Sequence, residues 1–328
     1  MKNNELSYCP GTLAVGHSTY STTCLRRVFN GRKVNHLLPY DSPSTNTESD
    51  DLFDENRMRI SISGVQEKFS VLLEKNKLRL KNDIEQGTYI LKPIPSTGSK
   101  REEMPANEHL TMQIARQVYG IETAENALVF FKNGDPAYIT KRFDVGMEGQ
   151  KLAKEDFASL AGRTPQTHGE NYKYLGSYLE LFNLMKKYVP AYTIEAPKLF
   201  KLIVFNYLFS NGDAHFKNFS LLETSLGDFR LSPAYDLLNS RVHIKDSDFA
   251  LEEGLLPKNI AKGTTMKQFL MLAEITGISS IQVGNIFDKI LSNSVKVEEL
   301  IEASYLSNQT KRNYLQAYQT RLKKLNRG

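Results

Sequence analysis

Apolar and polar residues alternate in short runs through the first 143 residues, and a period of two is typical of strands. The pattern predicts strands over 59–63, 68–73, 77–80, 89–92, 127–131 and 137–141. The Asn133-Gly134 pair favours a tight hairpin between the last two. Helical spacing is limited here to 22–30 and about 105–119, where Gly120 follows as a C-cap. This part of the chain is therefore expected to be rich in β-structure.

From residue 144 onward the spacing of apolar residues becomes mainly helical. We expect a hairpin formed by 219–222 and 229–231, and helices over about 154–160, 172–187, 196–210, 266–275, 279–291, 296–303 and 308–325. The polar stretch 41–57 is the best linker candidate. The sequence thus predicts an α+β chain: an N-terminal segment and linker (1–57), a small β-rich lobe (58–143) and a mostly helical lobe (144–328).

The formal net charge is +5, but the charge is concentrated in the tail. Residues 311–328 carry six basic side chains and no acid, which leaves the remaining residues at −1. A DNA-binding body is therefore not indicated. The most apolar stretch, Leu199 to Phe209, is far shorter than the roughly 20 residues that a membrane span needs. With no signal peptide evident, we expect a cytoplasmic protein without a membrane partner.

Two cysteines, Cys9 and Cys24, lie close together near the N-terminus. Their spacing relative to His17 and His36 fits no zinc-finger pattern. We expect reduced, structural thiols.

The strongest chemical signal is the run from Asn211 to Phe219, which directly follows the apolar helix. It places Asp213 and Asn218 in a D-x-x-x-x-N spacing, and the predicted hairpin would return Asp236 to the same place. Phosphoryl transfer uses one carboxylate as base, with an amide oxygen and a second carboxylate on Mg²⁺. The alternative interpretation is that these residues are loop-capping polars.

Two weaker signals lie upstream. The segment Ser61 to Lys68 is a turn with one glycine and two hydroxyls that can direct backbone N–H groups at phosphate oxygens, or is an ordinary hairpin turn. Lys92 ends a strand and Glu108 lies on the next helix, as in the ion pair that positions ATP phosphates in protein kinases. Each residue has a surface alternative, but the order of all the signals is the order that a two-lobed kinase requires.

In its motifs the chain resembles the HipA-type toxin kinases from about Ser61 to the C-terminus: S-I-S-G-V-Q-E-K-F-S, T-Y-I-L-K-P, N-E-H, I-T-K-R-F-D, G-D-A-H-F-K-N-F and A-Y-D. Full-length members carry a further N-terminal subdomain, whereas only about 60 residues precede the phosphate turn here. That shortness and the double serine make the sequence similar to HipT, the toxin of the three-part HipBST systems. In those systems the small protein HipS resembles the missing subdomain.

The resemblance implies a two-lobed protein-kinase-like fold and a serine/threonine protein kinase that uses ATP and Mg²⁺. Asp213 would be the catalytic base, Asn218 and Asp236 would hold the metal, and Ser61 and Ser63 match the family's autophosphorylated serines. Lys141 to Phe143 would form the hinge beside adenine, although some members have an acid in place of Lys141. The implied ATP-binding residues are Ser63, Gly64, Val65, Gln66, Glu67, Lys68, Lys92, Glu108, Lys141, Arg142, Phe143, His215, Lys217 and Tyr235.

The family also implies partners. Its members phosphorylate an aminoacyl-tRNA synthetase (glutamyl or tryptophanyl) and pair with a HipB-like DNA-binding antitoxin, so that DNA is contacted only indirectly. A HipS-like small antitoxin is expected as well. Two alternatives stay open from the residues: a small-molecule kinase, since D-x-H-x-x-N also occurs in lipid and antibiotic kinases, and a non-catalytic partner of a DNA-binding repressor.

Overall fold

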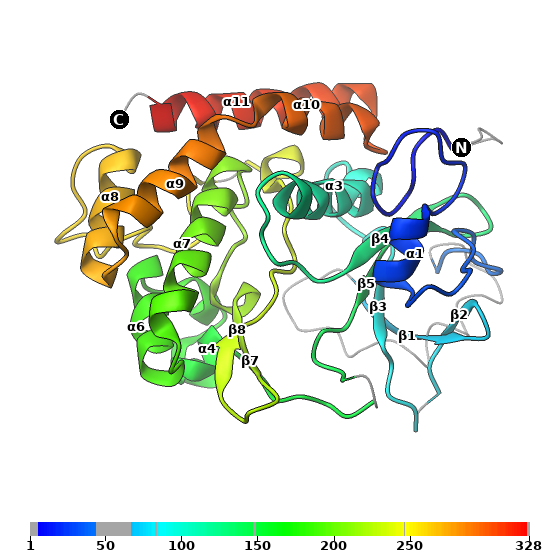
Figure 1. Ribbon diagram of the computed structural model, residues 1–328, viewed down its shortest axis with the longest axis horizontal. Helices are drawn as coiled ribbons and strands as arrows, with labels where there is room; N and C mark the ends of the chain where they lie inside the picture. The colour runs from blue at the N-terminus through cyan, green and yellow to red at the C-terminus, as the bar shows by residue number, and fades with distance from the viewer. Residues whose placement is uncertain (1–5, 44–66, 83, 147–148, 246, 327–328) are drawn as a thin grey trace. The chain divides into compact units, whose positions relative to one another are not determined.

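The computed structural model describes residues 6–43, 67–82, 84–146, 149–245 and 247–326 (Figure 1). The chain divides into two units, each assembled from segments that are distant in sequence. Unit 1 comprises residues 1–113, 124–150 and 299–311, and unit 2 comprises residues 114–123, 151–298 and 312–328. The predicted linker beyond residue 43, the predicted strand 59–63 and most of the predicted phosphate turn lie outside the described residues.

Unit 1 is organised around a five-stranded antiparallel sheet with the strand order β2-β1-β3-β5-β4. Its strands are β1 (Phe69–Glu74), β2 (Lys77–Leu80), β3 (Tyr89–Lys92), β4 (Asn126–Phe130) and β5 (Pro136–Lys141). These confirm the strands that alternation predicted in this range. The β4–β5 turn places Gly134 at a φ of 89°, a conformation that glycine adopts without a steric penalty.

The N-terminal segment completes the core of unit 1 (Figure 1). Helix α1 (Thr22–Val28) begins at Ser21, whose hydroxyl accepts a hydrogen bond from the Cys24 backbone N–H. The hydroxyl of Tyr20 donates to the Leu128 carbonyl of β4 at 2.6 Å, and the hydroxyl of Tyr89 donates to the Val28 carbonyl at 2.8 Å. The segment therefore covers the sheet, a role that sequence patterns left undefined.

Both cysteines are free and buried in this core, as predicted. The Cys9 sulfur lies beside the Cys24 thiol and accepts backbone N–H groups of Gly11, Thr12 and Ser21. The hydrogen bond from Cys24 and those from Ser21 and Thr12 outweigh burial and lower the pKa of Cys9. Among the described residues, no group of three or more His, Cys, Asp or Glu side chains is placed to hold a metal ion.

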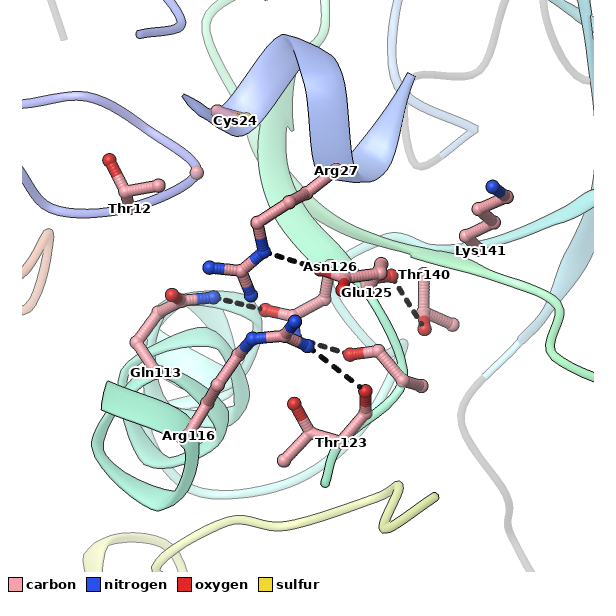
Figure 2. Close-up of polar contacts among 12 residues, drawn as sticks. Thr12, Cys24, Arg27, Gln113, Arg116, Thr123, Glu125, Asn126, Thr140 and Lys141 are labelled. Carbon is pink, nitrogen blue, oxygen red and sulfur yellow. Dashed lines mark hydrogen bonds and ion pairs between the residues drawn. The ribbon is translucent and has the colours of Figure 1, made fainter. Parts of the chain in front are cut away.

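The 3₁₀ turn η1 (Arg101–Glu103) leads into helix α3 (Met104–Gln117), whose first ten residues belong to unit 1. This part of α3 has a buried polar face, and the polar side chains on that face make hydrogen bonds. Gln113 donates to Asn126 Oδ1 of β4 at 2.8 Å, as Figure 2 shows, and Asn126 donates onward to the Ala124 carbonyl. The Nε2 atom of His109 donates to the Gly11 carbonyl at 3.1 Å. Buried polar groups that are satisfied in this way fix one orientation of the helix.

Unit 2 is mostly helical and holds a three-stranded antiparallel sheet in the order β6-β7-β8. Its strands are β6 (Lys154–Asp156), β7 (Ser220–Glu223) and β8 (Phe229–Leu231), the last two being the predicted hairpin. Its helices are α4 (Phe157–Leu160), α5 (Pro165–His168), α6 (Tyr178–Tyr188), α7 (Tyr192–Leu208), α8 (Thr265–Thr276) and α9 (Ser280–Leu291), together with the 3₁₀ turns η2 (Tyr172–Tyr174), η3 (Phe216–Asn218) and η4 (Ser240–Val242). Helices α10 (Ser294–Ala303) and α11 (Asn308–Asn326) contribute residues to both units.

Two predicted helices in unit 2 were partly wrong. Residues 154–156 form β6 rather than helix because they pair with 220–222 of β7, a tertiary contact that overrides local preference. The helix predicted from residue 172 begins only at Tyr178. Gly176 precedes it at a φ of 85° and Ser177 is extended, so the chain cannot be helical there.

The basic helix α11 packs into unit 2. Tyr318 stacks on Phe209 with ring centroids 5.1 Å apart. The Arg321 side chain is fully buried, lies over the Tyr207 ring at 4.6 Å and pairs with Asp248 at 2.5 Å. One of the tail's positive charges is thus a packing element. None of the helices in the described ranges is long and apolar enough to cross a membrane.

Candidate functional site

The predicted lysine–glutamate pair forms in unit 1. Lys92 at the end of β3 and Glu108 on α3 lie with Nζ and Oε1 2.6 Å apart, and their side chains are only 5% and 4% exposed. The Tyr138 ring on β5 lies 5.3 Å from the same ammonium group. Because both side chains are buried, Lys92 is not a solvated residue at a strand end, which was the alternative interpretation.

The other predicted nucleotide-binding residues of unit 1 are less informative. Ser61 and Ser63 to Gln66 lie outside the described residues, while Glu67 and Lys68 precede β1 and are partly buried. Lys141 donates to Asn30 Oδ1 at 2.7 Å, and Arg142 makes a bidentate pair with Asp144. The Lys141 and Arg142 side chains are thus engaged within unit 1.

A second ion pair lies near the predicted hinge (Figure 2). Arg27 of α1 pairs with Glu125 at 3.0 Å, and the Glu125 carbonyl accepts the Thr140 hydroxyl and the Lys141 backbone N–H of β5. This pair is about one quarter exposed, so it contrasts with the buried Lys92–Glu108 pair.

In unit 2, the loop after α7 is held by backbone contacts. Ser210 ends the helix at a φ of 53°, and its carbonyl accepts both the hydroxyl and the N–H of Ser240. The Ser240 hydroxyl accepts the Gly212 N–H at 2.8 Å. Asn211 donates to Asn206 Oδ1 at 3.0 Å. These bonds fix the backbone on which Asp213 stands.

Asp213 and Asn218 are joined through the backbone of His215. The His215 N–H donates to the Asp213 carbonyl at 2.7 Å and to Asn218 Oδ1 at 3.2 Å. The Asp213 side chain is 48% exposed and accepts the Tyr174 hydroxyl at 2.8 Å. The loop therefore presents a reachable carboxylate with an amide oxygen on the following turn, as the D-x-x-x-x-N spacing predicted.

His215 itself is buried and neutral. Burial, the largest cause, together with Lys173 and Lys217, lowers its pKa to about 3, and nearby Asp236 opposes the shift only in part. The Tyr174 ring lies against it edge-on with centroids 5.1 Å apart. The buried imidazole therefore orders the loop.

The segment after β8 comes back to this loop. Tyr235 donates its hydroxyl to the Lys217 carbonyl at 2.9 Å and accepts the Ser220 hydroxyl. Asp236 follows with a φ of 55°, a left-handed conformation that a non-glycine residue adopts at a steric cost and that is concentrated at functional sites. The hairpin therefore brings Asp236 close to His215, on the loop that carries Asp213 and Asn218.

This cluster has the donor set of a phosphoryl-transfer site. An exposed carboxylate can accept a hydroxyl proton, and one amide oxygen with one carboxylate fits Mg²⁺, which takes only one or two protein carboxylates when phosphates supply the rest. Sequence reasoning missed the contact of Tyr174 with Asp213. The two residues are 39 positions apart, and no local pattern could have joined them.

Comparison with solved structures identifies the fold as kinase-like. A Shewanella oneidensis MR-1 HipA, solved with HipB and operator DNA, matches with a TM-score of 0.63 at 19% identity, over 88% of this chain and 73% of that one. The Helicobacter pylori proinflammatory kinase CtkA matches with a TM-score of 0.54 at 15% identity, over 78% of this chain and 90% of that one. Both matches confirm the predicted fold class.

The chain belongs to the HipA-like C-terminal domain family, whose model matches residues 60–298. A putative kinase of Haemophilus influenzae is 24% identical over 94% of this chain and 93% of its own length. The putative kinase Y4dM of Sinorhizobium fredii is 33% identical over 60% of this chain, and the match spans 48% of Y4dM. The predicted family is thus confirmed, while the closer similarity to HipT stays a prediction.

Proposed function

We propose that the chain is an ATP- and Mg²⁺-dependent serine/threonine protein kinase and the toxin of a toxin–antitoxin system. The observation that carries the proposal is the cluster in unit 2, where a fixed loop presents Asp213, Asn218 and the returning Asp236. The buried Lys92–Glu108 pair supports it, because kinases use that pair to position ATP phosphates.

The proposal gives each residue a role. Asp213 accepts the proton of the acceptor hydroxyl, and Asn218 and Asp236 hold Mg²⁺, which neutralises phosphate charge when bound. Lys92 contacts the ATP phosphates, with Glu108 holding its ammonium group. The remaining nucleotide contacts come from Ser63 to Lys68, from Lys141 to Phe143, and from His215, Lys217 and Tyr235.

The acceptor we propose is an aminoacyl-tRNA synthetase, glutamyl or tryptophanyl, whose modification blocks translation in the cytoplasm. The family membership supports a toxin, and the Shewanella HipA was solved with HipB and operator DNA. We accordingly propose a HipB-like antitoxin, through which DNA is reached indirectly, and a HipS-like small antitoxin. Ser61 and Ser63 are proposed autophosphorylation sites, where phosphate would place close to two negative charges beside those of ATP.

The decisive experiment expresses the wild-type chain and Asp213→Ala in bacteria that lack the antitoxins. We expect the wild type to arrest growth and Asp213→Ala to grow normally, since the variant lacks the base. Glu274→Ala is the matched control, because it removes an exposed carboxylate from the helical part of the same unit and should arrest growth like wild type. Equal growth of wild type and Asp213→Ala would refute the toxin kinase and favour a non-catalytic partner of a repressor.

Metal dependence is tested with Asp236→Asn, which keeps a residue type that tolerates the left-handed backbone and removes the charge. We expect Mg²⁺ with ATP to raise the Tm of the wild type and not that of the variant. If the two proteins shifted equally, Asp236 would not be a metal ligand. Phosphate transfer to proteins and to small molecules, measured in parallel, decides between a protein kinase and a small-molecule kinase.

A further inference from the structure

The Tyr174 hydroxyl donates to Oδ1 of Asp213, one of the two oxygens from which the proposed base would accept a proton. A general base must lie within about 2.6–3.2 Å of the oxygen whose proton it takes. The distance from the Tyr174 hydroxyl to Asp213 Oδ1 is 2.8 Å, within that range. The contact is part of the described structure of unit 2 and involves the residue proposed as the base.

Tyr174 is held there by hydrogen bonds to the backbone carbonyls of residues 174 to 176. The Glu252 N–H donates to the Tyr174 carbonyl at 3.0 Å, and the Glu253 N–H donates to the Gly176 carbonyl at 3.1 Å. Arg163 donates to the Leu175 carbonyl at 2.7 Å. The contact with Asp213 therefore belongs to an anchored segment rather than to a single swinging side chain.

The segment 169–176 is bounded by two glycines in the left-handed region, Gly169 with φ 74° and Gly176 with φ 85°. A Cβ at Gly176 would lie 2.4 Å from Glu180 Oε2, so a larger residue would force the Glu180 side chain away from Arg163. Glycines with this backbone freedom let the segment carry Tyr174 over the loop and give it points at which to move.

From this geometry we infer that Tyr174 is an acceptor-site residue: its hydroxyl competes with the substrate hydroxyl for Asp213, and segment 169–176 must yield before an acceptor reacts. The inference rests on the proposed kinase function. The inference also favours a protein as the acceptor. A protein segment buries surface against unit 2, and that binding energy can displace Tyr174 from Asp213. A small solute has little binding energy with which to do so.

The test compares wild type with Tyr174→Phe, which removes the hydroxyl and keeps the ring that packs on His215. Acceptors are water, followed as phosphate release from ATP, and casein, followed as incorporated phosphate. Because a hydrogen bond to a charged group contributes about 1.5–3 kcal/mol, we expect the variant to lower the KM for casein and raise ATP hydrolysis, each by about 10- to 150-fold. The KM for ATP should not change.

Tyr188→Phe is the matched control, because it removes the same group at the end of α6, where the ring lies near the Lys187 ammonium group instead. It should behave as wild type in both assays. An unchanged or raised KM for casein in Tyr174→Phe, or a loss of kcat alone, would overturn the inference and make Tyr174 a positioning residue. If the wild type were no more active than Asp213→Ala on both acceptors and also failed to arrest growth, the kinase function on which the inference rests would be refuted instead.

Discussion

Removing Glu108 should destabilise unit 1 strongly, because it leaves a lysine buried without its carboxylate. The Lys92 and Glu108 charges are 2.6 Å apart and nearly inaccessible. Coulomb attraction at an effective dielectric constant of about 20 is about 6 kcal/mol at that separation, and desolvation of the two ions offsets much of it. Breaking such a pair by deleting one partner costs about 3–5 kcal/mol. Glu108→Ala should therefore lower the free energy of unfolding by that amount.

The assay is urea unfolding followed by far-ultraviolet circular dichroism. Glu125→Gln is the control, since its pair with Arg27 is partly exposed and should contribute about 1 kcal/mol or less (Figure 2). The double variant Lys92→Met with Glu108→Leu replaces both ions by apolar groups and should recover most of the lost stability while failing to bind ATP.

Two results would refute this reasoning. If Glu108→Ala unfolded within about 1 kcal/mol of wild type, the pair would not be energetically buried. If the double variant recovered stability and still bound ATP as wild type does, Lys92 would be a structural residue and the assigned phosphate contact would be wrong.

Two further predictions concern buried groups. Arg321→Ala should lower the free energy of unfolding by about 2–4 kcal/mol, because it removes buried packing and the pair with Asp248. Lys324→Ala removes the exposed partner of the same Asp248 and should lower it by less than about 1 kcal/mol. Similar urea midpoints for the two variants would contradict this. Burial lowers the pKa of His109 to about 4 in the folded state. Below about pH 6.5 the unfolded state therefore binds more protons than the folded state. The free energy of unfolding should fall by about 3 kcal/mol between pH 6.5 and pH 4. His109→Gln should flatten that slope, and an unchanged slope would show that other groups cause it.

The sequence predicted those parts of the molecule that depend on local residue patterns. Lys92 ends an alternating run and Glu108 lies on a periodic one, so both elements and their pairing followed from spacing and family resemblance. The loop residues Asp213 and Asn218 were found because a fixed spacing of five positions carries their chemistry. Such features depend on neighbours in the chain rather than on the full fold.

The parts that escaped prediction depend on contacts between distant segments. Strand β6 has the sequence Lys-Glu-Asp, which shows no apolar alternation and becomes a strand only because β7 lies beside it. The Tyr174 contact and the packing of the N-terminal segment are likewise made by side chains whose partners are remote in sequence. Periodicity contains no information on such pairs.

The segmented make-up of unit 1 bears on the timing of its folding during synthesis. Its last piece, residues 299–311, leaves the ribosome long after residue 150, and at 5–20 residues per second the delay is roughly 8–30 s. That piece supplies Tyr305, whose ring packs on Phe130, and Ser307, whose N–H donates to Glu103. The nascent chain therefore holds an incomplete β-rich unit for nearly half of translation. During that interval a partner that is already folded can reach it first.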